Sequence, residues 1–298
     1  MTSILDMKSV TDVITQCPDE RSVIRMMMNE GLIRNSANCE KCGGPMTLRN
    51  RKDSMEWRCR IGKGDCSSKS IKTGSFFSST RLSLTQALKI VVMWNGKYSS
   101  LQIAREVKTL PQTVCDWRNF LRELCSEIES TYPKIGGNGH IVEIDETNVH
   151  TRKYGRGKEK SDDWILGGVD RESGKVFVCQ VPNRTALTLV PLLQANIDRD
   201  SIVYSDEWAS YSQLKKYFTS HFTVKHKTQF VNLVGTRLVC TNGIEGLWSR
   251  LKKPFKQGNG TSEALIGSYL SEFVVRENEK DGFFKAIIEQ LKTKACKN

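Results

Sequence analysis

The order of segments after residue 141 constrains the fold of this chain more than any other feature of its sequence. The run HIVEIDETNVH is typical of a strand, and DDWILGGVDRESGKVFVCQVP is typical of two strands joined by a turn at RESGK. A helical segment, TALTLVPLLQANI, follows, and DSIVYSDEWASY then has the pattern of a further strand. A last helix, TNGIEGLWSRLKK, closes the series. This alternation predicts an α/β domain.

Three acidic residues fall at related places in this series. Asp145 lies near the end of the first strand, Asp206 lies at the end of the fourth, and Glu245 lies in the first turn of the last helix. A strand, a hairpin, a helix and a further strand match an RNase H-like core, a mixed sheet flanked by helices in which the first strand lies beside the fourth. We therefore expect Asp145 and Asp206 at neighbouring strand ends, with Glu245 completing the cluster. Four positions after Glu245 stands Ser249, so the ion pair usual on an exposed helix is missing.

Such a cluster predicts a site for two divalent cations. Carboxylate oxygens suit Mg²⁺ or Mn²⁺ rather than zinc. Two ions about 3.5–4 Å apart activate an attacking oxygen and stabilise the leaving one in an in-line displacement at phosphorus. Glu143 shares a strand face with Asp145 and stays a further candidate, whereas Glu146 and Glu207 point to the opposite face, where we expect basic partners.

Four of the ten cysteines form a cluster that predicts a second kind of metal site. Cys39 and Cys42 stand in a C-x2-C pair, and six residues separate Cys59 from Cys66. Four thiolates brought together across a β-hairpin form a tetrahedral cage that suits Zn²⁺, and no histidine precedes His140. A ribbon of this size depends on its metal to fold, so the zinc is structural. Four unrelated free cysteines are the alternative.

The segments between 83 and 129 show helical periodicity. The first follows an N-cap at Ser83, the second starts near Ser99, and the third opens at Pro111. Three helices with short connections fit a helix-turn-helix, although periodicity alone leaves a plain three-helix packing unit equally open. The candidate DNA contacts near the start of the third helix are Thr113, Arg118 and Asn119.

The net charge of +12 favours a polyanionic partner, most often nucleic acid, over the alternative that it serves solubility alone. Residues 39–81 carry ten Lys or Arg against four Asp or Glu, and residues 150–160 carry five more Lys or Arg. We expect the second segment to be a flap that tracks DNA. The candidate phosphate contacts are Arg49, Arg51, Lys52, Arg58 and Arg60 in the ribbon, Arg152, Lys153 and Arg156 in the flap, and Arg250, Lys252 and Lys253 in the last helix.

The sequence carries no sign of a membrane partner. No apolar run approaches the ~20 residues of a membrane helix. The opening MTSILDMKSVTDV lacks the pattern of a secretion signal. We expect an intracellular protein, nuclear if its source is eukaryotic and otherwise cytoplasmic or in the nucleoid.

With these motifs in order, the chain resembles a DDE transposase of the Merlin group, the eukaryotic relatives of a bacterial insertion-sequence transposase family. The resemblance rests on CEKC with CRIGKGDC, the helix-turn-helix, VEIDET, WILGGVDRESGKVF, VYSDEW, NGIEGLWSRLKK and YLSEFVVREN, which together span nearly the whole chain. The long second cysteine knuckle favours the Merlin side over the bacterial one. One departure is Cys240, because members of the family often carry a histidine shortly before the N-x-I-E motif.

The resemblance implies an activity and a set of roles. Asp145, Asp206 and Glu245 would be the catalytic, metal-binding triad for cleavage and strand transfer with Mg²⁺. Terminal inverted repeats and target DNA would be the double-stranded substrates, and a homo-oligomer would bridge both ends. Asn242 and Trp248 flank Glu245 and would support it, Asn242 as a helix cap and Trp248 through core packing or DNA stacking.

The motifs also predict domain boundaries. The expected parts are an N-terminal helical segment (1–35), a four-cysteine zinc ribbon (36–80), a helix-turn-helix DNA-binding domain (81–130), a linker (131–140) and an RNase H-like catalytic domain (141–298). Two other functions stay open. One is a domesticated, sequence-specific DNA-binding protein without cleavage activity, and the other is an RNase H-like nuclease or resolvase.

Overall fold

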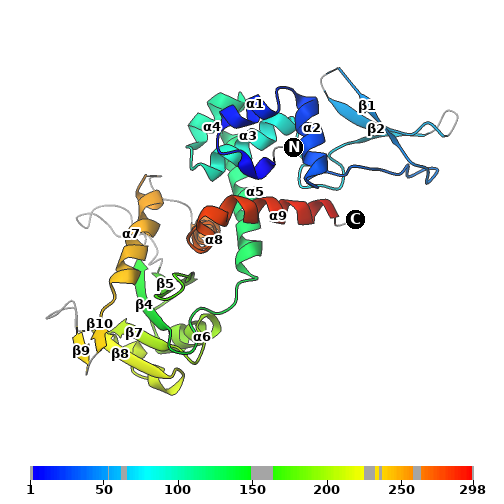
Figure 1. Cartoon of the computed structure of the whole chain (residues 1–298). Helices are drawn as coiled ribbons and strands as arrows, with labels where there is room; N and C mark the ends of the chain where they lie inside the picture. The colour runs from blue at the N-terminus through cyan, green and yellow to red at the C-terminus, as the bar shows by residue number, and fades with distance from the viewer. Residues whose placement is uncertain are drawn as a thin grey trace. The chain divides into compact units, whose positions relative to one another are not determined.

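The computed structural model describes residues 3–52, 54–61, 66–148, 164–224, 232–234, 237–257 and 263–296. The chain divides into two compact units, one of residues 1–124 with 281–298 and the other of residues 125–280 (Figure 1). The boundary between them falls inside one long helix, α5 (Pro111–Glu129).

The first unit combines helices with a small antiparallel sheet. Besides the first part of α5, its helices are η1 (Ile4–Asp6), α1 (Val10–Gln16), α2 (Glu20–Asn29), α3 (Leu84–Asn95), α4 (Ser100–Val107) and α9 (Phe283–Cys296). Its strands are β1 (Thr47–Asn50), β2 (Met55–Arg58) and β3 (Ser68–Ser70), which pair in that order.

The three predicted helices between residues 83 and 129 are present. Ser83 and Ser99 each accept a hydrogen bond from the backbone of the third helical residue, whose side chain bonds back to the cap, so both helices start in capping boxes. Pro111 opens α5, where its missing N–H leaves no bond unmade. Glu20 of α2 accepts from the backbone N–H groups at the start of α3 and joins these two helices.

The C-terminal helix α9 belongs to the first unit. The predicted catalytic domain extended to residue 298, whereas the second compact unit ends at Lys280, followed by α9 after the short η5 (Lys280–Gly282). The reason is apolar packing inside the first unit: the Phe283 ring of α9 lies 5.3 Å from the Trp94 ring of α3, measured between centroids. An ion pair from Lys292 to Glu30 at 3.7 Å adds to it.

The second unit contains a five-stranded mixed sheet in the order β6-β5-β4-β7-β8. Its strands are β4 (Ile141–Asn148), β5 (Trp164–Asp170), β6 (Val176–Val181), β7 (Ile202–Asp206) and β8 (Ser220–Val224). β4, β5 and β6 pair antiparallel, while β7 runs parallel to β4 and to β8. The predicted placement of the first strand beside the fourth is therefore confirmed. A separate two-stranded sheet is made by β9 (Asn232–Val234) and β10 (Arg237–Val239).

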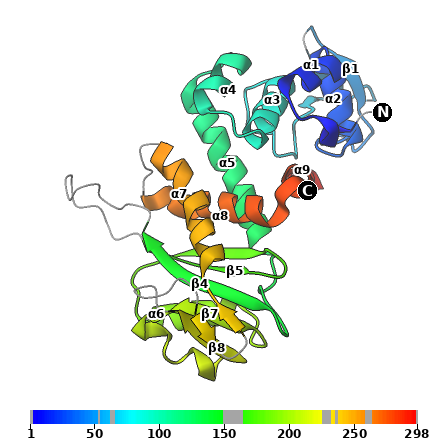
Figure 2. The ribbon, with the colours of Figure 1, turned by 60° about the vertical axis from the view of Figure 1, so that its left-hand side comes forward.

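Helices cover both faces of the five-stranded sheet (Figure 2). They are α6 (Ala186–Asn196), η3 (Ala209–Tyr211), η4 (Leu214–Lys216), α7 (Asn242–Gln257) and α8 (Glu263–Glu279). One core lies between α7, α8 and the sheet, and the other lies between α6, η3, η4 and the opposite face. Side chains alternate along β4, so Ile144 enters the α6 core while Asp145 faces α7.

Among the described residues, no helix combines the length and the apolar character that crossing a membrane requires.

Candidate active site

Asp145 and Asp206 come from neighbouring parallel strands. In the pairing of β4 with β7, Ile141 lies opposite Ile202 and Glu143 opposite Tyr204, and the same register continued by two residues brings Asp145 level with Asp206. Burial raises the pKa of the Asp145 carboxyl, and the nearby charge of Asp206 raises it further. The two carboxylates are thus close enough to repel each other.

The first turns of α7 are tied to β4 by two hydrogen bonds. Trp248 Nε1 donates to Asp145 Oδ2 at 2.9 Å, and the backbone N–H of Ile244 donates to Glu143 Oε2 at 2.9 Å. Glu245 lies between these two contacts with an exposed side chain. The tertiary structure therefore places the helix turn that contains Glu245 against the face of β4 that carries Asp145.

The spacing of the three acids differs from that of a compact ligand set. Among the described residues, two groups of at least three His, Cys, Asp or Glu have ligand atoms all within 4.8 Å of one another: the four clustered cysteines, and His140 with Asp170 and Glu172. The acids at 145, 206 and 245 do not form such a group.

Glu143 was a further candidate ligand in the sequence, and the structure shows which groups its carboxylate contacts. Its buried carboxylate accepts from Arg171 Nε at 2.5 Å as well as from the start of α7. Arg171 Nη2 also donates to the carbonyl oxygen and the Sγ of Cys240, at 2.7 and 2.9 Å. Cys240, where the family pattern departs, thus lies in a network that holds the strand-to-helix entry of α7.

Gly167 explains how Trp248 can reach Asp145. Gly167 lies directly opposite Asp145 in the pairing of β4 with β5. A Cβ atom at this glycine would come within 2.5 Å of the Trp248 ring. The missing side chain leaves the space that the indole fills, and Trp248 is buried in the core under α7. Core packing of Trp248, one of the two predicted alternatives, agrees with this position.

Asn242 is the first residue of α7, and the backbone N–H of Glu245 donates to the carbonyl oxygen of Thr241 at 3.2 Å. Helical hydrogen bonding therefore begins at Thr241, one residue before the position expected to cap the helix. Asn242 is exposed, and the carboxylate of Glu143 accepts from the backbone N–H of Ile244 at the helix start.

The four predicted zinc ligands come together in the first unit. Cys39, Cys42, Cys59 and Cys66 form one of the two groups with ligand atoms within 4.8 Å, and Cys42 Sγ lies 3.5 Å from Cys59 Sγ. Hydrogen bonds from the backbone N–H groups of Cys42 and Lys41 lower the pKa of the Cys39 thiol to about 6. Thiols that close, one of them ionised easily, have the chemistry of a tetrahedral Zn²⁺ site.

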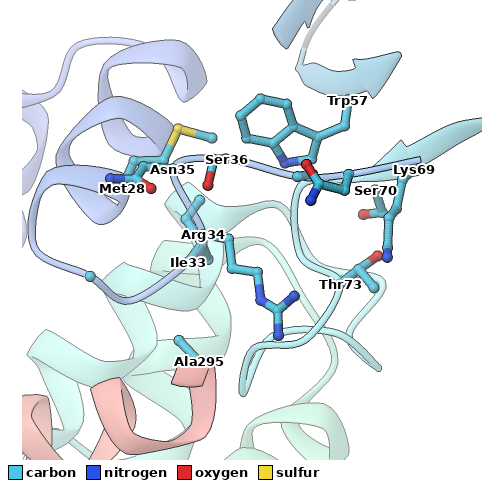
Figure 3. A pocket seen from close by; sticks show the side chains of 13 residues that line it. Met28, Ile33, Arg34, Asn35, Ser36, Trp57, Lys69, Ser70, Thr73 and Ala295 are labelled. Carbon is cyan, nitrogen blue, oxygen red and sulfur yellow. The ribbon is translucent and has the colours of Figure 1, made fainter. Parts of the chain in front are cut away.

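A cavity of about 510 Å³ lies beside the sheet of β1, β2 and β3 in the first unit (Figure 3). Its lining includes Arg34, Trp57, Lys69 and Ala295. Lys69 is already paired with Glu40 at 2.6 Å. The candidate acids belong to the second unit.

The predicted DNA contacts have varied surroundings. In the ribbon, Lys52, Arg58 and Arg60 are exposed and Arg49 is half-buried, while Arg51 forms an ion pair with Glu56 at 2.8 Å. On α5, Thr113 and Asn119 are half-buried and Arg118 donates to Ser100 of α4 at 3.1 Å.

On α7, Lys253 is exposed, Lys252 is half-buried, and Arg250 makes a two-point ion pair with Glu277. Arg152, Lys153 and Arg156 lie outside the described residues.

One cluster of side chains beside the acids was not predicted from the sequence. The guanidinium of Arg184 contacts two indoles, its Cζ 4.4 Å from the Trp164 ring centroid and 4.2 Å from that of Trp208. The buried carboxylate of Glu146 lies 3.5 Å from Arg184 Nη2. Burial raises the pKa of Glu146 to about 7, and the charge of Arg184 opposes this. The sequence predicted a basic partner for Glu146 without identifying Arg184. No sequence motif indicates that Trp164 and Trp208 contact this arginine.

Comparisons with known proteins identify relatives of this chain. Residues 136–278 match the family model of the ISXO2-like transposase domain. A transposase-like protein of Haemophilus influenzae is 33% identical over 110 residues, which cover 36% of this chain and 84% of that protein.

Solved structures similar to this chain include two viral integrase cores. The catalytic core of BIV integrase is 17% identical, with 48% of this chain and 86% of that chain covered and a TM-score of 0.33. The HTLV-2 integrase core in complex with magnesium is 19% identical, with 48% and 87% covered and a TM-score of 0.30. On the family match and the bacterial relative, the chain belongs to the family of ISXO2-like transposase-domain proteins.

Proposed function

We propose that the chain is a DDE transposase of the Merlin group that cuts DNA at terminal inverted repeats and joins the freed ends to target DNA. The observation that supports this most is that Asp145 and Asp206 lie on neighbouring parallel strands, with the first turns of α7 held against the face that carries Asp145. Hydrolysis of a phosphodiester at the element end frees a 3′-hydroxyl. That hydroxyl attacks a phosphodiester of the target, where a new P–O bond forms as the old one breaks.

The three acids would hold Mg²⁺ or Mn²⁺. All three supply hard carboxylate oxygens, and the repulsion between Asp145 and Asp206 is what a bound cation relieves. When bound, such ions activate the attacking oxygen and stabilise the leaving one. Trp248 fixes the orientation of Asp145 through its N–H group, and Glu143 holds the helix start that carries Glu245.

The remaining parts of the proposal concern DNA recognition. The zinc-bound ribbon and the three-helix segment of the first unit would recognise the terminal repeats, and the basic residues of the ribbon and of α7 would contact phosphates. A homo-oligomer would bridge the two ends. We place this activity in the nucleus if the source is eukaryotic, and otherwise in the cytoplasm or nucleoid.

Strand cleavage tests the proposal directly. The full chain is incubated with duplexes from the DNA that flanks its gene, with and without Mg²⁺. Asp145→Ala, Asp206→Ala and Glu245→Gln are each expected to lower cleavage by at least about 100-fold, because each removes a cation ligand. Glu207→Gln, an exposed acid beside Asp206, is the matched control and should leave cleavage unchanged.

Other outcomes would favour the alternative functions. Specific binding of the end duplex without Mg²⁺-dependent nicking would indicate a domesticated DNA-binding protein. Faster cleavage of a branched junction than of the end duplex would indicate a nuclease or resolvase.

A further inference from the structure

Trp208 stands at the edge of the candidate active site with 41% of its surface exposed. It comes two residues after Asp206, and its backbone N–H donates to Asp206 Oδ1 at 3.0 Å. Its indole Nε1 donates to the carbonyl oxygen of Arg184 at 3.3 Å. Both its backbone and its ring are therefore held relative to the carboxylate of Asp206.

One face of this indole is already covered. The Arg184 guanidinium lies over this ring, 4.2 Å from its centroid, and also over the Trp164 ring at 4.4 Å. The Glu146 carboxylate, 3.5 Å away and buried, keeps the guanidinium in this position. Since the cation occupies one face of Trp208, the exposed surface lies on the remaining face and edge of the ring.

A rigid, half-exposed indole beside catalytic carboxylates suits a planar aromatic ligand. A nucleobase stacks on an indole whatever its sequence, and each such contact is worth a considerable share of the binding free energy. A base inside an intact duplex has both faces covered by its neighbours, so the contact requires an unpaired or terminal base. Because Trp208 and Asp206 share one turn, we expect a phosphodiester bound at Asp206 to bring a flanking nucleotide close to Trp208.

We propose that Trp208, supported by Arg184 and Trp164, is a stacking site for an unpaired nucleobase next to the scissile phosphate. The site would stabilise a locally opened DNA end and fix which phosphodiester lies against the acids. This inference rests on the proposed function, since it takes the DNA end as the ligand.

The test uses the full chain with Asp145→Asn, which is expected to block cleavage while keeping an acceptor for the Trp248 N–H. The probe is the gene-flanking duplex with 2-aminopurine replacing each adenine in turn. At the stacked position, Trp208→Ala should raise the fluorescence of the bound probe and weaken binding roughly 5- to 150-fold. Trp208→Phe retains a ring and should recover most of both signals. Tyr217→Ala, which removes another exposed aromatic side chain of the same unit, is the control.

The outcomes separate this inference from the proposed function. The stacking site is overturned if the bound probe has the same fluorescence at every position with the Asp145→Asn chain and with the chain that also carries Trp208→Ala. This holds even if the unsubstituted chain cuts the duplex in Mg²⁺. A Trp208-dependent signal on a duplex that the unsubstituted chain never cuts supports the stacking site and overturns the transposase. A change in oligomer size with no change in fluorescence would make Trp208 a protein contact instead.

Discussion

At the scale of single residues, Glu143 shows how position decides what a carboxylate does. It shares a strand face with Asp145, yet its two oxygens are taken by Arg171 and by the backbone N–H of Ile244. A buried carboxylate with both partners in place is a structural group rather than a free ligand. We therefore assign Glu143 to positioning α7 and, through α7, to positioning Glu245.

Glu143→Gln separates positioning from metal binding. The amide keeps an acceptor for Ile244 but loses the ion pair, and the broken buried pair should cost about 3 kcal/mol of unfolding free energy. Because the effect is structural, the loss should be the same with and without Mg²⁺ in denaturant titrations. A loss that appears only in Mg²⁺ would instead make Glu143 a cation ligand. Glu172→Gln on the neighbouring turn serves as the control.

His140 gives a pH-dependent contribution at the other end of the same strand. Its Nδ1 lies 2.9 Å from the buried Asp170, and this hydrogen bond raises the pKa of His140 above its usual 6.5. A raised histidine pKa means that the folded state binds the proton more tightly, so the stabilisation is present below pH 6.5 and is lost as pH rises through the folded pKa. In denaturant titrations from pH 5 to 9, the difference in unfolding free energy between the natural chain and His140→Gln should be largest at low pH and should shrink as pH rises. A difference that grows with pH would contradict the assignment.

At the scale of elements, we expect the sheet of β1, β2 and β3 to depend on metal binding by the four clustered cysteines rather than on its core. Its three strands have three or four residues each, and few of their side chains are buried. Such a small sheet buries too little apolar surface to fold alone, and we expect metal binding to supply the missing free energy. The grouping of the four cysteines is consistent with this dependence.

Removal of one thiol tests this dependence. Cys42→Ala should lose bound zinc and speed hydrogen exchange throughout β1, β2 and β3, while the amides of the five-stranded sheet stay protected. Cys115→Ala removes an exposed cysteine of α5 and should keep both zinc and protection. Metal analysis and hydrogen-exchange mass spectrometry measure the two quantities. Full protection of the ribbon in Cys42→Ala would show that the sheet needs no metal.

At the scale of the whole molecule, the chain consists of two compact units, and its last helix belongs to the first of them. The apolar face of α9 packs against Trp94 of α3, far away in the sequence. Each unit therefore has its own core, and we expect each to unfold in its own transition.

Matched core substitutions address the two transitions. Phe283→Ala on α9 and Phe177→Ala on β6 each remove a buried ring and should cost about 3–5 kcal/mol. In calorimetry, Phe283→Ala should lower the melting temperature of one transition and Phe177→Ala that of the other. A single transition shifted equally by both variants would mean that the two units unfold together.

Local sequence signals were enough for several elements of each unit. Capping boxes at Ser83 and Ser99 and the proline at Pro111 mark helix starts by hydrogen bonds within a few residues, and the structure has helices there. The order of strands and helices likewise indicated the mixed sheet with β4 beside β7. The cysteine spacing indicated the thiol cluster in the same way.

The sequence by itself therefore determined many segments and the acids at two strand ends, because these depend on patterns between near neighbours. It indicated the sheet order only through the succession of strands and helices, which matches an RNase H-like core. Only the tertiary structure decided which partner each polar group meets. Glu143 caps α7, Arg250 pairs with Glu277, and Arg184 stacks on Trp208. Each of these contacts joins residues from different elements, and side-chain chemistry alone does not select among the many acids and bases of one chain. Burial and distance make that choice once the elements have packed.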